Sequence, residues 1–195
     1  MFIGKEVALS VDMTNCKQLE KLNDTIRHCT LCPLHETRTN AVPGEGSCDA
    51  SVMLVGEAPG AKEDETGRPF VGRSGQLLVS LLEEIGLNRE DVFITSILKS
   101  RPPKNRTPTQ FEVNVCRPYL ERQIELIKPR FIVLLGGVAI SSLIGPRKVS
   151  ESHGRFYESG SQTFFMTYHP AAALRFPKVK TTMREDFKTL GLALV

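Results

Sequence analysis

The sequence predicts an α/β protein, a three-layer α/β/α sandwich with a central, mostly parallel four-stranded sheet. Two observations lead to this prediction. Short apolar runs, typical of strands buried on both faces, alternate along the chain with longer segments of helical periodicity. Loops rich in Gly, Pro and charged residues follow the apolar runs directly. In parallel sheets these loops meet at one edge, where ligands bind.

The predicted strands are nearly continuous hydrophobic runs, as expected for strands that helices cover on both sides. They occupy residues 51–55, 91–98, 130–137 and 162–170. Because each run is separated from the next by a helical segment, the order along the chain favours a mostly parallel sheet.

Helices are predicted where apolar residues recur three and four positions apart. Thr109 is the expected N-cap of the helical segment within 107–129, because Glu112 follows at the spacing of a capping box. We expect a single domain over residues 16–195, after a loosely tied lead-in at residues 1–15. The other predicted helices are 16–28, 73–87, a short helix after 137 and a closing helix over 178–191.

Composition restricts the class of protein. Of the 195 residues, 41% are hydrophobic and 24% charged, which is typical of a globular chain with one well-packed core. No apolar run is long enough to span a membrane and no secretory signal is visible, so we expect a cytoplasmic protein. The five cysteines do not indicate a disulfide framework, and Cys16 and Cys48 are expected to be free thiols.

A basic loop follows the second predicted strand. Its cations are interleaved with prolines, which lower the entropic cost of holding charges in place. The net charge of +3 does not by itself require a nucleic-acid partner, but a local basic segment can bind phosphates. A solvated basic face is the alternative. We predict DNA contacts from Lys99, Arg101, Lys104 and Arg106.

Several motifs, in order along the chain, resemble those of family 4 uracil-DNA glycosylases, the iron–sulfur type. They are "RTNAVPGEG" (38–46), "GEAPGAKEDETGRPFVGRSGQLL" (56–78), "RPPKNRTPT" (101–109), "CRPYLERQIELIKPRFIVLLG" (116–136) and "TYHPAAALR" (167–175). The resemblance implies the same fold and a DNA repair glycosylase. Such an enzyme flips a nucleotide out of DNA, excises uracil or a related deaminated base by hydrolysis, and leaves an abasic site. We expect a monomer, and the sequence identifies no replication-clamp partner.

The resemblance assigns the base pocket to Gly56 and Phe70, with Phe70 as the ring on which uracil stacks. It makes Glu57 and His169 catalytic. Glu57 would orient water or bind the base, and Ala58 stands where other uracil glycosylases carry an aspartate. A neutral His169 would donate a hydrogen bond to uracil O2 as the base leaves as an anion.

The same resemblance places a DNA-distorting loop after His169. Leu174 would push into the DNA as a wedge, and Arg175 would contact a phosphate. The three pocket residues also have structural interpretations when each is taken alone. Phe70 would be a core residue, Glu57 a solvated carboxylate, and His169 a histidine with satisfied hydrogen bonds.

Two serines depart from the family pattern in "TSILKSRPP" (95–103). The resemblance implies an asparagine at the position of Ser96, where its amide would read the uracil edge through one donor and one acceptor. Ser96 would take this base-binding place with a shorter, freely rotating hydroxyl. We therefore predict weaker uracil excision, a broader choice of base, or both.

The second serine, Ser100, stands where the resemblance implies a cysteine of a [4Fe–4S] cluster. Cys29, Cys32 and Cys116 match the other three ligands, and four thiolates are the usual set. Three alternatives stay open: Ser100 or a water binds the fourth iron, another cysteine reaches the site, or the cluster is lost. A Cys-x2-Cys pair also occurs in zinc sites and in simple packing. We expect a cluster.

Two other functions compete with excision. A DNA-binding superfamily member or damage sensor with weak or no activity would carry the same motifs, and the two serines keep this alternative open. A nucleotide-binding α/β protein unrelated to DNA is disfavoured, because the chain has neither a P-loop nor a G-x-G-x-x-G motif.

Overall fold

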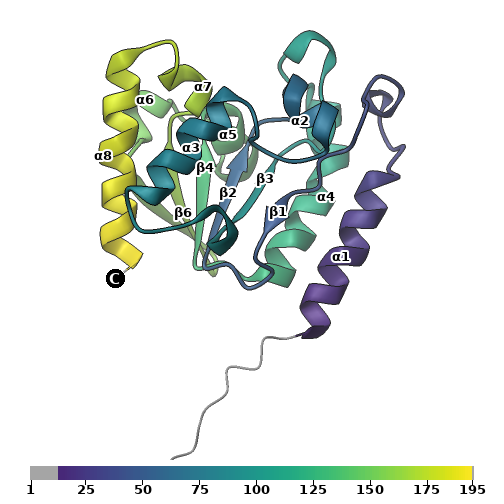
Figure 1. Ribbon diagram of the computed structural model, residues 1–195, viewed down its shortest axis with the longest axis horizontal. Helices are drawn as coiled ribbons and strands as arrows, with labels where there is room; N and C mark the ends of the chain where they lie inside the picture. Colours follow the sequence, from purple (N-terminus) through teal and green to yellow (C-terminus); the bar gives the residue numbers. More distant parts are fainter. Residues whose placement is uncertain (1–12, 195) are drawn as a thin grey trace, which may run out of the picture.

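A computed structural model describes residues 13–194 of the chain. Within that range a six-stranded sheet lies between two layers of helices (Figure 1). The strand order is β1-β3-β2-β4-β6-β5. The strands are β1 (Glu45–Gly46), β2 (Val52–Gly56), β3 (Phe93–Ser96), β4 (Phe131–Leu135), β5 (Arg155–Ser159) and β6 (Gln162–Thr167).

The four predicted strands are the central ones, and they pair in parallel as β3, β2, β4 and β6. The prediction of a four-stranded sheet omitted β1 and β5, which pair antiparallel at the two edges. β1 has only two residues, and most side chains of β5 are exposed. Neither edge strand produces the apolar run by which a buried strand is identified.

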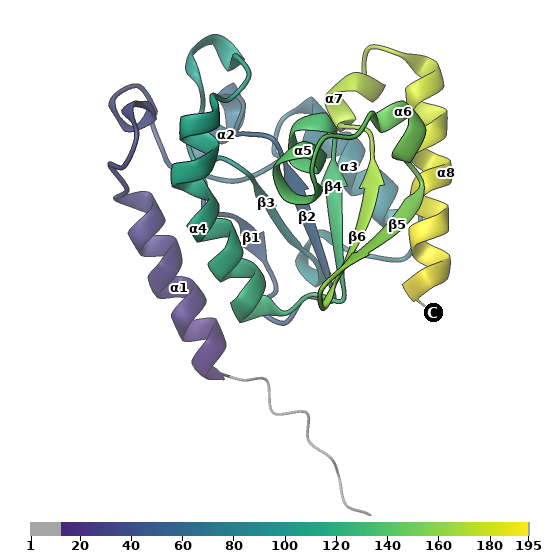
Figure 2. The same cartoon turned by 180° about the vertical axis from the view of Figure 1, so that it is seen from behind.

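Helices cover both faces of the sheet (Figure 2). One layer consists of α1 (Met13–Arg27), α4 (Gln110–Ile127) and α5 (Gly137–Ile144). The other layer contains α3 (Arg73–Glu83) and α8 (Pro177–Leu194). Short helices in the connections are α2 (Ala61–Thr66), α6 (Val149–Ser152) and α7 (Pro170–Ala173). Within residues 13–194, no helix is both long and apolar enough to cross a membrane.

Two helix starts test the predicted boundaries. Thr109 caps α4 as predicted: its side chain accepts the Glu112 N–H, and the Glu112 carboxylate accepts the Thr109 N–H. α1 begins at Met13 rather than Cys16, so the end of the predicted lead-in is helical. Residues 1–12 of that lead-in lie outside the described residues.

Side chains of the central strands alternate between two hydrophobic cores. In β2, Met53 and Val55 pack against the layer of α1, α4 and α5, whereas Val52 and Leu54 pack against α3 and α8. Strands covered on both faces must be apolar at successive positions, which is why these segments are continuous hydrophobic runs. Polar residues are therefore concentrated in the loops at the ends of the strands.

Cys16 of α1 and Cys48, in the loop between β1 and β2, form a disulfide with a Cα–Cα distance of 5.3 Å. The prediction that both cysteines are free thiols was wrong. An odd total of cysteines does not reveal that two of them meet, because the partners are far apart in the sequence. Since both sulfurs are in this bond, neither cysteine is available as the fourth ligand of a cluster.

Candidate active site

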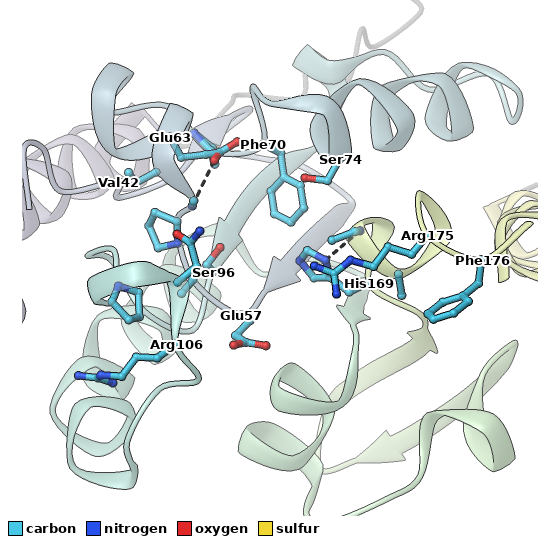
Figure 3. Close-up of a pocket in the computed structure, with 18 residues that line it drawn as sticks. Val42, Glu57, Glu63, Phe70, Ser74, Ser96, Arg106, His169, Arg175 and Phe176 are labelled. Atoms are coloured by element: carbon cyan, nitrogen blue, oxygen red, sulfur yellow. Dashed lines mark hydrogen bonds between the residues drawn. The ribbon is translucent and has the colours of Figure 1, made fainter.

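A cavity of about 470 Å³ opens at the carboxyl ends of the parallel strands. Figure 3 shows Glu57, Phe70, Ser96 and His169 around this space, each from a different loop or strand end. These side chains come from distant parts of the sequence and were predicted to meet at this edge. The segment after β4, Gly136-Gly137, contributes Gly137 to a neighbouring groove that Glu57 also lines.

Phe70 forms one wall of the cavity, and its backbone is strained. Its φ of 47° lies in a region that bulky residues rarely adopt, at a cost of ~1–3 kcal/mol. The ring packs over the end of β2, where a Cβ on Gly56 would lie 2.6 Å from the ring's ζ carbon. Gly56 is in contact with the Phe70 ring and is not among the residues that line the cavity, and its predicted place in the base pocket stays a prediction.

His169 lies beside Phe70, with ring centroids 5.7 Å apart. It caps α7, since its Nδ1 accepts the Ala171 backbone N–H at 3.1 Å. In the neutral ring the proton is therefore on Nε2. Burial lowers the pKa of His169 to about 4, and the negative charge of Glu63 only partly opposes this shift. At neutral pH the ring is an uncharged hydrogen-bond donor.

Glu57 brings a carboxylate into the same cavity. Burial raises the pKa of this carboxyl above its ordinary value. Within residues 13–194 the side chain has no hydrogen-bond or ion-pair partner, so both oxygens can bind water or a ligand. The neighbouring Ala58 also lines the cavity, but it has no polar side-chain group that could bind water or a ligand.

Ser96 ends β3 and is 5% exposed. Its Oγ lies 3.2 Å from the place that a Cβ on Gly56 would occupy, close to the Phe70 wall. Because a serine is shorter than an asparagine, a ligand that reaches this hydroxyl must enter more deeply or bind through water.

Lys99 is buried, with 2% of its surface exposed, although it was predicted to contact DNA. Its ammonium donates to Thr95 Oγ1, to the Ser96 carbonyl oxygen at 2.9 Å and to Gln123 Oε1 at 2.7 Å. Loss of hydration lowers the pKa of Lys99 to about 7. The prediction was wrong because the chain stays inside the protein beyond the end of β3.

The other cations of the basic loop are accessible. Arg106 lines the cavity and forms a two-pronged ion pair with Glu112, at 2.6 and 2.9 Å. Lys104 is exposed, and the Arg101 Nε donates to Asn105 Oδ1 at 2.8 Å. Asn105 also lines the cavity. The sequence prediction missed Asn105, since one amide between basic residues has no distinguishing pattern.

The loop after β6 places exposed apolar groups at the cavity mouth. Leu174, the predicted wedge, is 42% exposed but does not line the cavity. Phe176 is 59% exposed and lines the cavity together with Arg175. Phe176 is a second wedge candidate, which the sequence prediction missed because a phenylalanine is usually a core residue.

Comparison with known proteins decides what the site belongs to. A family model described as the Uracil DNA glycosylase superfamily matches residues 43–190. A type-4 uracil-DNA glycosylase of Pyrobaculum aerophilum is 50% identical over 177 residues, which are 86% of this chain and 90% of that protein. The chain belongs to the type-4 family of uracil-DNA glycosylases.

Further type-4 relatives support the assignment. The enzyme of Thermotoga maritima is 47% identical over 160 residues, covering 80% of this chain and 83% of that protein. The enzyme of Sulfurisphaera tokodaii is 46% identical over 184 residues, covering 88% and 83%. The resemblance to this family and the predicted sandwich fold are confirmed.

The predicted cluster ligands of this glycosylase meet at a second, small cavity. It is lined by Cys29, Cys32, Ser100 and Cys116. The three thiols are free, and burial raises the pKa of both Cys32 and Cys116. Among the described residues, no three His, Cys, Asp or Glu side chains already converge closely enough to bind a metal ion.

Hydrogen-bond donors surround these ligands. The Lys99 N–H donates to Cys116 Sγ at 3.3 Å, and Arg38 donates to Ser100 Oγ at 2.8 Å. N–H groups and a guanidinium suit an anionic iron–sulfur cluster held by thiolates. The donor set of the glycosylase therefore fits such a cluster but has one thiolate fewer than the usual four.

Proposed function

We infer that this type-4 uracil-DNA glycosylase excises uracil by holding a flipped-out nucleotide between Phe70, Glu57 and His169. The observation that carries the inference is that an aromatic ring, a carboxylate and a neutral imidazole line one cavity of about 470 Å³. That volume lies within the range of small-molecule sites. We propose that the enzyme acts as a monomer, because one copy of the chain can supply Phe70, Glu57 and His169 to the cavity.

The reaction that fits these groups breaks the bond between deoxyribose C1′ and uracil N1. The base stacks on Phe70, a contact worth ~1–3 kcal/mol per base. As the bond breaks, its electron pair stays with uracil, and His169 donates its Nε2 proton in a hydrogen bond to the developing anion. Water adds to C1′, and Glu57 accepts the water proton, to which its raised pKa is suited.

Ser96 makes us propose a looser choice of base than an asparagine would give. One rotating hydroxyl reads a base edge less strictly than an amide, which presents a donor and an acceptor in one plane. Deaminated purines such as hypoxanthine then compete better with uracil, because the wrong base leaves fewer buried polar groups unpaired.

We further propose that Cys29, Cys32 and Cys116 hold a [4Fe–4S] cluster, with Ser100 at the fourth position. Bound there, the cluster would link three parts of the chain: the segment after α1, helix α4, and the buried segment that follows β3. It has no part in the excision steps described above. Iron and acid-labile sulfide analysis, with the visible absorbance of the purified protein, tests the proposal directly.

Excision is tested with a single-stranded oligonucleotide that contains one uracil. Cleavage of the abasic product by alkali should appear with the wild-type protein. The H169A variant should lose about 10²–10³-fold in kcat, the usual effect of removing one donor to a developing anion. Binding of the oligonucleotide without release of uracil by the wild type would contradict the inference and favour a damage sensor.

A further inference from the structure

We propose that Glu63 and Arg89 are positioning residues that hold the Phe70 wall in the conformation needed for stacking. This inference rests on the proposed stacking role of Phe70. Residues 69–72, here called the wall segment, contain the positive φ of Phe70. Such a conformation persists only where the surrounding structure over-determines it. The groups that fix the wall segment in this conformation are found among its hydrogen-bond partners.

Glu63, on α2, holds the N–H groups of the wall segment. Its Oε1 accepts the backbone N–H of Val71 and of Gly72, both at 2.9 Å. A left-handed residue turns the following N–H groups toward one side, which makes a small anion-binding concavity. The Glu63 carboxylate fills this concavity, and hydrogen bonds to a charged acceptor are the strong ones.

The same carboxylate reaches the loop that carries Glu57, the proposed catalytic base. Glu63 Oε2 accepts the backbone N–H of Gly60 at 3.1 Å, three residues beyond Glu57. One side chain thus fixes the distance between the stacking wall and the loop after β2. The bond to Gly60 is part of an ordinary helix cap, but the bonds to Val71 and Gly72 are not needed for α2 to form.

Arg89 holds the carbonyl groups of the wall segment from the other side. Its guanidinium donates to the carbonyl oxygens of Pro69 and Phe70, the latter at 3.1 Å. Its Nε is fixed by Glu45 at 3.0 Å, and its side chain is only 18% exposed. The wall segment therefore has its N–H groups bound by an anion and its C=O groups bound by a cation.

Close packing completes the arrangement. A Cβ on Gly75 would lie 1.8 Å from the Phe70 carbonyl oxygen, so only a glycine lets α3 approach the wall segment here. Glu63 and Arg89 bind the main chain and leave the Phe70 ring free to face the cavity. They act on the reaction mainly through the ring, so removing the ring should remove most of their effect.

The test is a double-mutant cycle measured as single-turnover kcat/KM for uracil excision. We expect E63Q to lower kcat/KM about tenfold to a hundredfold, the usual range for hydrogen bonds to a charged group. In an F70A background, the same E63Q change should lower it less than threefold. E65Q is the matched control, because Glu65 is exposed on the same helix and, among residues 13–194, its carboxylate pairs with Lys62 alone. This control should excise uracil at the wild-type rate.

R89K repeats the test from the carbonyl side and should show the same loss only when Phe70 is present. It also serves if E63Q does not fold, which thermal unfolding of each variant will show. Equal losses from E63Q and R89K with and without the Phe70 ring would overturn the positioning role. A wild-type rate for F70A would instead remove the stacking role itself, and this inference with it.

Discussion

Measurements of activity at acid pH should distinguish the contribution of Glu57 from that of His169, the two proposed catalytic groups. The Glu57 carboxylate must be ionised to accept a proton, and His169 must be neutral for its Nδ1 to accept the Ala171 N–H that orients the ring. Burial raises the pKa of Glu57 above 4.5 and lowers the pKa of His169 to about 4. As the pH falls, wild-type activity should therefore be lost first through Glu57, at a pH above 4.5.

The E57Q variant isolates the histidine. With a pKa of about 4, His169 is about 90% neutral at pH 5, whereas an ordinary histidine with a pKa of about 6.5 is about 3% neutral. The residual excision of E57Q should thus stay within about twofold between pH 7 and pH 5. An unburied histidine would lose about twenty-fivefold over the same interval.

The assay is single-turnover excision from a short uracil oligonucleotide, quenched in alkali, in buffers of constant ionic strength from pH 4 to pH 8. Circular dichroism at each pH confirms that the protein stays folded. H169N should abolish any remaining fall near pH 4. If the residual activity of E57Q falls with a midpoint near pH 6.5, the ring is hydrated and the argument from burial is refuted.

Three further changes test other parts of the structure. S96N should raise kcat/KM for uracil about tenfold and lower it for hypoxanthine, because the amide restores paired contacts; equal effects on both bases would contradict the looser pocket. Replacing Cys16 and Cys48 by alanine should lower the free energy of unfolding by about 3–4 kcal/mol, since the disulfide spans 32 residues. Chemical denaturation measures this loss, and an unchanged midpoint would show that the bond does not form. K99M should leave the salt dependence of DNA binding unchanged, whereas K104A should reduce its slope by about one; a reduced slope for K99M would show that Lys99 reaches DNA.

The parallel strands were predictable because burial on both faces leaves a strong signal in the sequence. β2 and β4 are apolar at successive positions, and only a covered sheet requires that. The edge strands carry no such requirement. β1 is held by pairing with β3, and its residues Glu45 and Gly46 have no strand propensity of their own. Tertiary pairing, not local sequence, makes them a strand.

The side chains that line the cavity could be predicted from the sequence, but the residues that hold those side chains in place could not. Glu57, Phe70 and His169 belong to motifs with a chemical purpose, and they meet as expected. Glu63 and Arg89 bind the main chain of another segment, and main-chain acceptors and donors are the same at every position of a sequence. Such partners can be found only once the backbone path is known.

Lys99 failed as a DNA contact for a related physical reason, and its true position connects the two unusual serines. Local sequence does not say where a chain leaves the core, and here residues 97–100 remain buried after β3 ends. Ser96, the last residue of β3 and directly before this segment, lines the first cavity, and Ser100 at the end of the segment lines the second cavity with the cysteines.

Lys99 ties the two ends of that segment together. Its side chain binds the Ser96 carbonyl oxygen, and its backbone N–H binds Cys116 Sγ. Lys99 therefore contacts both the end of β3 beside the first cavity and the cysteine end of the segment. The two serines, at positions where the resemblance implied other residues, thus lie on one buried stretch of chain, one at each cavity.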